Sequence, residues 1–406
     1  MFIEEMSMLE FQEFAQTHFI GNLYESINYA LLKAEEGYDY EFVCYRDTQV
    51  KAAALILYKK IGAYKYGYSP RGFLIDYSNL HLLKNFTNDL IAYYKKKNFA
   101  FIKINPEIAI AKFNNKQKQF EYNENVRLIE ILESCGYVKL KDNLNFESIL
   151  PRVNAIVNLD EFNITSLTKN TRNKIKKAIR KGLVLEKSTE NKIKDLYPFI
   201  AHKQNKSEYY YNDLFNVFEK NNSIDLLLVK IDYKKFLINS QNFYNKELMK
   251  NNYLNAKLVQ NNTSNIINAK MNSDKSLLSY KNDIAEAAKK INENETQYIA
   301  GALVVKYQNR VMVYISGFDQ NYARYVPNYF LYYAIIAYYK NDYKYLDLNG
   351  VTADLSSDNY YHGLNRFKMG FNPDIYEYIG EFDLPVDVNA YNHLLKSGLL
   401  AKEFNK

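Results

Sequence analysis

The sequence predicts an α/β (α+β) protein with two similar domains in tandem and a long antiparallel helical hairpin inserted into the second. Three observations predict this architecture. The chain has 406 residues, more than one ordinary core holds. A helix-to-strand pattern occurs twice, and the stretch between Pro198 and Gly301 contains neither glycine nor proline, which favours long helices.

The repeated pattern lies at residues 91–105, IAYYKKKNFAFIKIN, and at residues 336–349, IAYYKNDYKYLDLN. In both copies a helix end passes through a polar turn into an alternating apolar strand. Strand-like segments precede each copy, at 51–60 and 300–317. The alternative is chance resemblance in a chain rich in Tyr, Lys and Asn. We predict a first domain at 1–150 and a second at 151–235 and 298–406, whose C-terminal end can pack back on the first.

The inserted hairpin is predicted at residues 236–297. Leu277, Tyr280, Ile284, Ala287 and Ile291 alternate spacings of three and four, the seam of a helix that packs on one partner as in a coiled coil. The preceding segment is less regular, and NNTSN at 261–265 predicts the turn. The seam can serve the hairpin itself or a second subunit, so the oligomeric state stays open.

Composition narrows the classes of function. The two cysteines are far apart and the five histidines are isolated, so we expect no metal site and a reducing, cytoplasmic setting. The N-terminal MFIEEMSMLEFQEF is acidic where a signal peptide is basic and then apolar. The longest apolar run, Phe330 to Tyr339, falls short of the roughly 20 residues that span a bilayer, so any membrane contact should be peripheral. The net charge of +7 favours phosphate-bearing partners.

A strongly basic helix is predicted at residues 169–182, KNTRNKIKKAIRKG. Ile175, Ala178 and Ile179 form its apolar stripe, and Gly182 is placed to end it. On the polar side, Arg172, Lys176 and Arg180 align at spacings of four. Like charges without acidic partners repel one another, and phosphate groups would relieve that repulsion. The alternative is a solvated helix face.

Several motifs resemble those of the Fem family of tRNA-dependent peptidoglycan bridge aminoacyltransferases, in the family's order along nearly the whole chain. They are YSPRGFLIDYSN from residue 68, FIKINPEI at 101–108, LTKNTRNKIKKAIRKG at 167–182, LDLNGV at 346–351, HGLNRFKMGF at 362–371 and YIGEFDLPVD at 378–387. The set is specific, although each motif alone is weak.

This resemblance implies two GNAT-like domains and a transferase that uses no cofactor. The donor would be aminoacyl-tRNA carrying Gly, Ala or Ser. The acceptor would be the stem-peptide amine of a peptidoglycan precursor, either lipid II or UDP-MurNAc-pentapeptide. The hairpin is similar to the arm of members that act on lipid-linked precursors, which favours lipid II and contact with the inner membrane face.

The resemblance also implies site residues. Lys368, after Phe367, matches the family's Phe-Lys motif and takes the leading catalytic role, because a cation there suits an oxyanion or phosphate; the alternative is a surface lysine beside a buried Phe. Lys33 matches the position that holds the precursor's phosphates, although the usual upstream Trp is absent. Tyr68 and Arg71 are further substrate-binding candidates. The Arg71 guanidinium can bind a phosphate or tie its loop to a buried carboxylate, and we favour the second.

The chain departs from the family pattern in two places. Asn105 stands where the family commonly has Asp, and an amide cannot act as a general base, so the general base is unassigned. In NKSEYYYNDLFNVF, Tyr209 and Asn212 replace the usual Gly-Phe and phosphate-binding Arg, which makes them substrate-binding candidates of a different kind.

Two other functions fit parts of the sequence. A GNAT-like fold can transfer acyl groups from acyl-CoA, but the stretch GFDQNYARYVPNYFLYYA lacks the glycines that let backbone amides cradle a pyrophosphate. A non-catalytic nucleic-acid-binding protein with a coiled-coil arm would explain the basic helix and the arm. It leaves the repeated α/β unit and the Phe-Lys motif unexplained.

Overall fold

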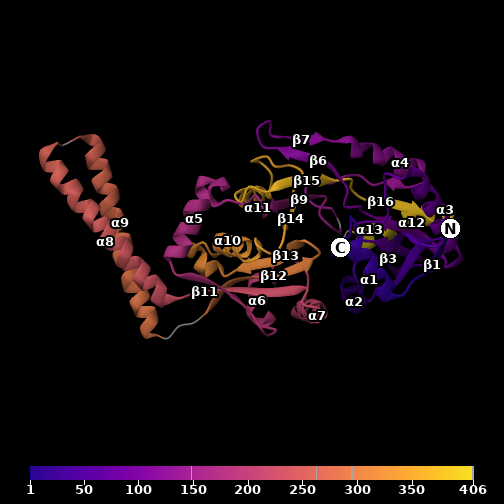
Figure 1. Cartoon of the computed structure of the whole chain (residues 1–406), viewed down its shortest axis with the longest axis horizontal. Coiled ribbons are helices and arrows are strands. Elements are labelled where there is room, and N and C mark those ends of the chain that lie inside the picture. The colour runs from indigo at the N-terminus through magenta and orange to yellow at the C-terminus, as the bar shows by residue number, and fades with distance from the viewer. Residues whose placement is uncertain (148, 262, 294–296, 405–406) are drawn as a thin grey trace.

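Two mixed sheets lie side by side, and a pair of long helices projects from the far side of the second sheet (Figure 1). The computed structural model describes residues 1–147, 149–261, 263–293 and 297–404. The α/β class and its mixed sheets are confirmed.

The first sheet has seven strands among the described residues. Their order is β1 (Phe2–Glu5), β2 (Asp39–Arg46), β3 (Val50–Ile61), β4 (Tyr64–Ser69), β5 (Phe99–Ile104), β16 (Phe382–Pro385) and β8 (Val138–Lys139). The helices that accompany it are α1 (Met8–Thr17), α2 (Ile27–Glu35), α3 (Leu80–Lys96), the 3-10 helix η1 (Glu124–Arg127), α4 (Leu128–Ser134), α12 (Val388–Lys396) and α13 (Leu399–Phe404).

The second sheet has nine strands within the same described ranges. Their order is β10 (Leu183–Lys187), β11 (Ile224–Ile231), β12 (Tyr298–Tyr307), β13 (Arg310–Phe318), β14 (Tyr345–Val351), β9 (Val153–Asn158), β15 (Asp374–Tyr378), β6 (Ala109–Asn114) and β7 (Gln119–Tyr122). Its helices are η2 (Ile164–Ser166), α5 (Lys169–Arg180), α6 (Ile193–Ile200), α7 (Glu208–Glu219), η3 (Gln320–Tyr325), α10 (Pro327–Tyr339) and α11 (His362–Met369).

The repeated sequence pattern occupies equivalent places in the two sheets. In each, an antiparallel strand pair leads into a helix and then into a strand parallel to the second of the pair: β3, β4, α3, β5 in the first sheet and β12, β13, α10, β14 in the second. Tyr94 near the end of α3 and Tyr339 at the end of α10 are both buried. The helix-to-strand unit predicted from the repeat is therefore present twice.

Each sheet also takes strands from the other half of the chain. β6 and β7 come from the N-terminal half but pair in the nine-stranded sheet, while β16 pairs with β5 in the seven-stranded sheet. The division of the chain at residue 150 stays a prediction about folding units.

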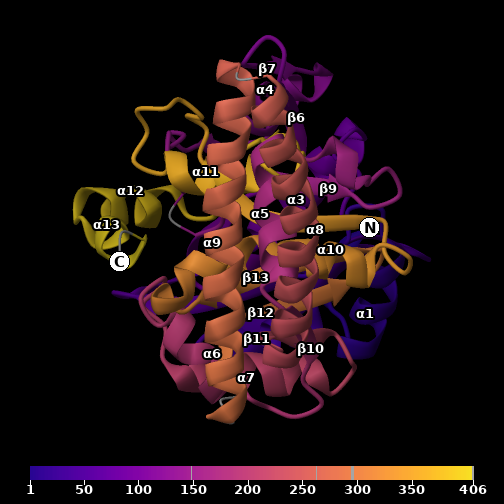
Figure 2. The same cartoon turned by 90° about the vertical axis from the view of Figure 1, so that its left-hand side faces the viewer.

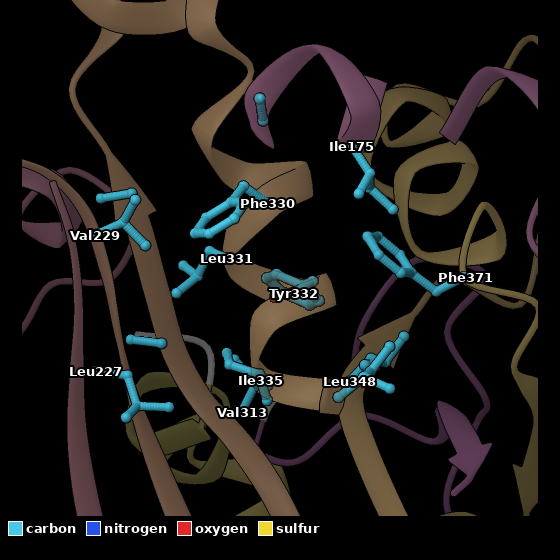
Figure 3. Close-up of a cluster of buried hydrophobic side chains, with 14 of the residues drawn as sticks. Ile175, Leu227, Val229, Val313, Phe330, Leu331, Tyr332, Ile335, Leu348 and Phe371 are labelled. Atoms are coloured by element: carbon cyan, nitrogen blue, oxygen red, sulfur yellow. The ribbon is translucent and has the colours of Figure 1, made fainter. Parts of the chain in front are cut away.

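The second sheet is covered on one face by α10 and α5. Figure 3 shows Phe330, Leu331 and Ile335 of α10 on the side of Leu227 and Val229 of β11, and Ile175 of α5 on the other side of α10, next to Phe371. α10 is apolar on nearly every side, as expected for a helix enclosed between a sheet and another helix. On the opposite face, a further core joins α6 and α7 to α1, α2 and the first sheet, so the two sheets share apolar packing.

The projecting pair consists of α8 (Tyr233–Gln260) and α9 (Ser264–Asn292), which run side by side along their length (Figure 2). Asn251 of α8 donates to Ser273 Oγ of α9 at 3.1 Å, and the rings of Phe243 and Tyr280 lie 5.9 Å apart. Of the predicted seam, Ala287 is buried and the other four side chains are half-buried. Asn262 in the predicted turn and residues 294–296 at the base lie outside the described residues, and coiled-coil geometry stays a prediction.

None of the described helices combines the length and apolar character needed to cross a membrane.

Candidate functional site

The strands β13 and β14 diverge, and this divergence creates the setting for Lys368. They pair in parallel only through Arg310–Met312 and Tyr345–Asp347; beyond Asp347, β14 continues beside β9. Helix α11 packs against β14 past this point. Lys368 Nζ donates a hydrogen bond of 2.6 Å to the backbone oxygen of Gly350, and the lysine is only 6% exposed.

Burial in this position makes Lys368 electrostatically unusual. It lowers the pKa of the ammonium from 10.5 to about 7; Asp347 opposes the shift and Lys203 adds to it. Near neutral pH, the amine is therefore present in both protonation states. A pKa displaced this far by burial is a recognised mark of functional sites, and the surface-lysine alternative does not describe this side chain.

Phe367, the neighbour of Lys368, lies in an aromatic cluster. Its ring centroid is 5.0 Å from that of Tyr329 and 4.9 Å from that of Tyr332, both on α10. It lines a cavity of about 220 Å³ together with Lys203, Ser316 and Tyr332. On the other side of α11, a cavity of about 920 Å³ lies between the β6–β7 hairpin and the start of α5. Lys368 thus lies on a helix with a cavity on each side.

Lys33 lies where α2 meets α7, at the junction of the two halves. Its Nζ is 2.5 Å from Glu36 Oε2 and lies over the rings of Tyr29 and Tyr38. Glu36 also pairs with Lys206, so two ammonium groups share one carboxylate. This arrangement has a surplus positive charge that suits a phosphate.

The two candidates on α7 point differently. The Tyr209 side chain is 81% exposed, whereas Asn212 donates to the backbone oxygen of Glu208 and accepts from Asn191. The residue between them, Tyr210, faces the junction instead, with its hydroxyl 2.5 Å from that of Tyr314. Helical periodicity around the buried Tyr211 could have indicated that Tyr210 faces inward. It could not have indicated its partner, because Tyr314 comes from a distant strand.

Tyr68 and Arg71 are buried beside Asn105. The Asn105 side-chain oxygen accepts from the Tyr68 hydroxyl at 3.3 Å and from the Arg71 backbone N–H at 2.8 Å. Arg71 has left-handed backbone geometry, with φ of 64°, and its guanidinium donates to Pro151 O. Its Nε is 3.9 Å from Glu107. Asn105 therefore organises the turn, and the substrate-binding role of Tyr68 and Arg71 stays a proposal.

Much of the charge on the basic helix α5 is engaged within the protein. Arg172 donates to the backbone oxygens of Thr165 and Leu167, and Lys181, just past the helix, lies 2.6 Å from Asp283 of α9. Arg180 approaches the same carboxylate at 3.8 Å and lies over the Tyr280 ring. These contacts attach the projecting helices to the second sheet.

Lys176 and Lys177 instead line a groove of about 450 Å³ between α5 and α8, together with the half-exposed ring of Phe243. Burial, together with Lys181 and Arg180, lowers the pKa of Lys177, so an anion in the groove would be favoured. Of the predicted phosphate contacts, Lys176 has the most accessible setting.

Within the part of the chain that the structure describes, no three His, Cys, Asp or Glu side chains are grouped to hold a metal ion. Sequence reasoning also missed Asp347, Lys203 and Lys206. Asp347 stands in the quoted LDLNGV segment and Lys206 in NKSEYYYNDLFNVF, but neither segment indicates which distant groups these side chains face, and Lys203 stands in no quoted segment.

Comparison with known proteins gives consistent matches over nearly the whole chain. The model of the FemAB family matches residues 6–396. The aminoacyltransferase FemA of Staphylococcus epidermidis is 25% identical over 379 residues, covering 89% of this chain and 90% of that protein. The lipid II:glycine glycyltransferase of Staphylococcus aureus is 24% identical over 403 residues, covering 94% and 92%. The crystal structure of FemX superposes with a TM-score of 0.74 at 21% identity, covering 98% of this chain and 100% of FemX, and so shares the fold.

Proposed function

Because the chain belongs to the FemAB family and is an aminoacyltransferase, we propose that it moves Gly, Ala or Ser from aminoacyl-tRNA to the stem-peptide amine of a peptidoglycan precursor. The product would be a peptide bond of the interpeptide bridge. The relative named lipid II:glycine glycyltransferase favours a lipid-linked acceptor, met at the cytoplasmic face of the membrane.

The observation that carries this proposal is the buried Lys368, which lies on a helix whose neighbouring residues line two cavities. An aminoacyl ester is already activated, so positioning the amine against it can supply on the order of 7 to 11 kcal/mol. The remaining tasks are to stabilise the oxyanion of the tetrahedral intermediate and to remove a proton from the attacking amine. A lysine with a pKa of about 7 suits the first as an ammonium and can take part in the second as an amine.

The two substrates would bind at separate cationic places. Lys33 and Lys206 would contact the phosphates of the precursor at the junction of the halves. Lys176 and Lys177 would contact tRNA phosphates in the groove beside α8. Phe243 in that groove offers a face on which a base can stack.

Acyl-CoA is a weaker candidate donor. The start of α10, where a pyrophosphate would need free backbone amides, carries Pro327, which has no N–H, after Val326 in left-handed geometry. A protein that only binds nucleic acid has no need of a buried lysine such as Lys368.

The experiment incubates the protein with a charged tRNA pool and lipid II, then measures the mass of the peptide. We expect the mass of one or more amino acids to be added and ribonuclease to abolish the addition. Lys368→Met should lose transfer but retain tRNA binding, while Lys340→Met, an exposed lysine at the end of α10, should retain both. Modification that depends on acyl-CoA, or tRNA binding without transfer, would refute the proposal.

A further inference from the structure

A small polar cavity lies between the two sheets, away from both Lys33 and the cavity beside Phe367. We name it the Arg71–Asp347 pocket; its volume is about 270 Å³. Its mouth lies between the loop at 19–23 and the turn at 307–309, where Phe19 is 73% exposed. Its inner wall consists of buried polar side chains from both halves: Arg71, Asn154 and Asp347, each 3% exposed, with Glu107 and Arg310 beside them.

A specific contact joins the two halves at the mouth. Gln308, in the turn after β12, donates its side-chain amide to the backbone oxygens of Ala15 and Gln16 at the end of α1. A Cβ on Gly21 would lie 2.2 Å from Ala15 O, so only glycine allows the loop to pass this close. The entrance therefore has a defined geometry.

The charges inside the pocket balance. Glu107 pairs with Arg310 and faces Arg71 Nε at 3.9 Å, while Asp347 accepts from the Asn154 amide at 3.1 Å and from the Asn349 backbone N–H at 2.7 Å. Two guanidinium groups and two carboxylates give the pocket no net charge. A small ligand that is neutral, zwitterionic or carries one ammonium group therefore meets no net repulsion there.

Hydrogen bonding in the pocket is incomplete. Among the described residues, Arg71 Nε and Asn154 Oδ1 have no hydrogen-bond partner, although both atoms are buried. One is a donor and the other an acceptor. Leaving such groups unpaired costs about 1–3 kcal/mol each, and assembling buried charges gains little stability by itself. A ligand that supplies one acceptor and one donor would complete the set.

We propose that the Arg71–Asp347 pocket binds an α-amino carbonyl group, the primary amine beside a carbonyl that a free amino acid or the amino end of a peptide carries. The amine faces Asp347 and Asn154 Oδ1, and the carbonyl oxygen faces Arg71. The volume is below the ~300–1,000 Å³ usual for drug-sized ligands, which suits so small a group.

Electrostatics support this orientation. Burial raises the pKa of Asp347, with Arg310 opposing and Glu107 adding to the shift, so an ammonium brought next to the carboxylate would stabilise its ionised form. Asp347 also interacts electrostatically with Lys368, which links the pocket to the proposed site of chemistry. The claim that an amino end bound here is the acceptor of transfer rests on the proposed function. The claim that the pocket binds an amino end does not.

The test is ligand-observed NMR on the intact protein, with glycinamide, glycine and triglycine as probes. Acetamide, which lacks the amine, and ethylamine, which lacks the carbonyl, are the controls. We expect glycinamide to bind at least ten-fold more tightly than either control. Triglycine binding as tightly as glycinamide assigns the pocket to a peptide amino end, and glycine binding more tightly than triglycine assigns it to a free amino acid.

Asp347→Asn keeps the shape of the side chain and should weaken glycinamide binding at least ten-fold, whereas Asp358→Asn, an exposed carboxylate, should not change it. Equal binding by wild type and Asp347→Asn, or equal binding of glycinamide and acetamide to the wild type, would overturn the proposal. The wild-type comparison does not depend on the folding of a variant. The assay contains neither tRNA nor lipid, so failure of the transfer assay would leave its result intact.

Discussion

Replacing Lys368 with methionine should stabilise the fold at neutral pH while abolishing transfer. The lysine is 6% exposed and its pKa falls from 10.5 in the unfolded chain to about 7 in the folded one. Between these values the unfolded chain binds more protons, so stability rises with pH. At roughly 1.4 kcal/mol per pKa unit, burying the amine costs about 4 kcal/mol at pH 7 and about 1 kcal/mol at pH 10.

Methionine has a similar shape and no charge, so it removes this cost. It also leaves the backbone oxygen of Gly350 without its 2.6 Å hydrogen bond, a loss of about 1–2 kcal/mol. The balance is a stabilisation of about 2–3 kcal/mol at pH 7 that disappears near pH 10.

Urea unfolding of wild type, Lys368→Met and Lys340→Met at pH 7 and pH 10 measures the effect. Lys340 is exposed, so its variant should match the wild type at both pH values. The reasoning would be refuted if the difference in free energy of unfolding between Lys368→Met and wild type did not change with pH. It would also be refuted if the variant were less stable than wild type at pH 7.

Three further outcomes are expected. Asp283→Ala leaves the buried Lys181 ammonium without its main partner and should lower the free energy of unfolding by roughly 3 kcal/mol in a thermal melt; no loss would mean that the pair does not hold the projecting helices. Gly182→Ala adds a Cβ 2.5 Å from Asp232 O at a positive φ, so it should destabilise more than Gly136→Ala, where φ is also positive but nothing lies within 4 Å; equal losses would remove the clash argument. Changing Lys176 and Lys177 together to Gln should lower the slope of log affinity for tRNA against log salt by roughly 2, and an unchanged slope would exclude the groove.

The residues of the basic helix illustrate how far sequence reasoning reached. Its apolar stripe predicted a helix docked through Ile175, Ala178 and Ile179 and ended by Gly182. The structure has α5 at Lys169–Arg180 with Ile175 and Ala178 buried and Gly182 at positive φ, but Ile179 is 43% exposed, so that part of the prediction is wrong. The partners of its charged side chains could not be predicted from the sequence. Asp283, the carboxylate that engages Arg180 and Lys181, is about a hundred positions away in the chain and on a different helix.

By itself, the sequence determined the local elements and the family. Helical and strand periodicity, the repeated helix-to-strand unit and the absence of helix breakers between Pro198 and Gly301 are properties of neighbouring residues, and the motifs carry the resemblance. Only the tertiary structure decided that Lys368 points inward to Gly350, that Asn105 braces Arg71, and that Arg71, Glu107, Arg310 and Asp347 meet in one pocket. Burial and pairing of charges depend on which distant segments pack together, and so these features appear only once the two sheets are assembled.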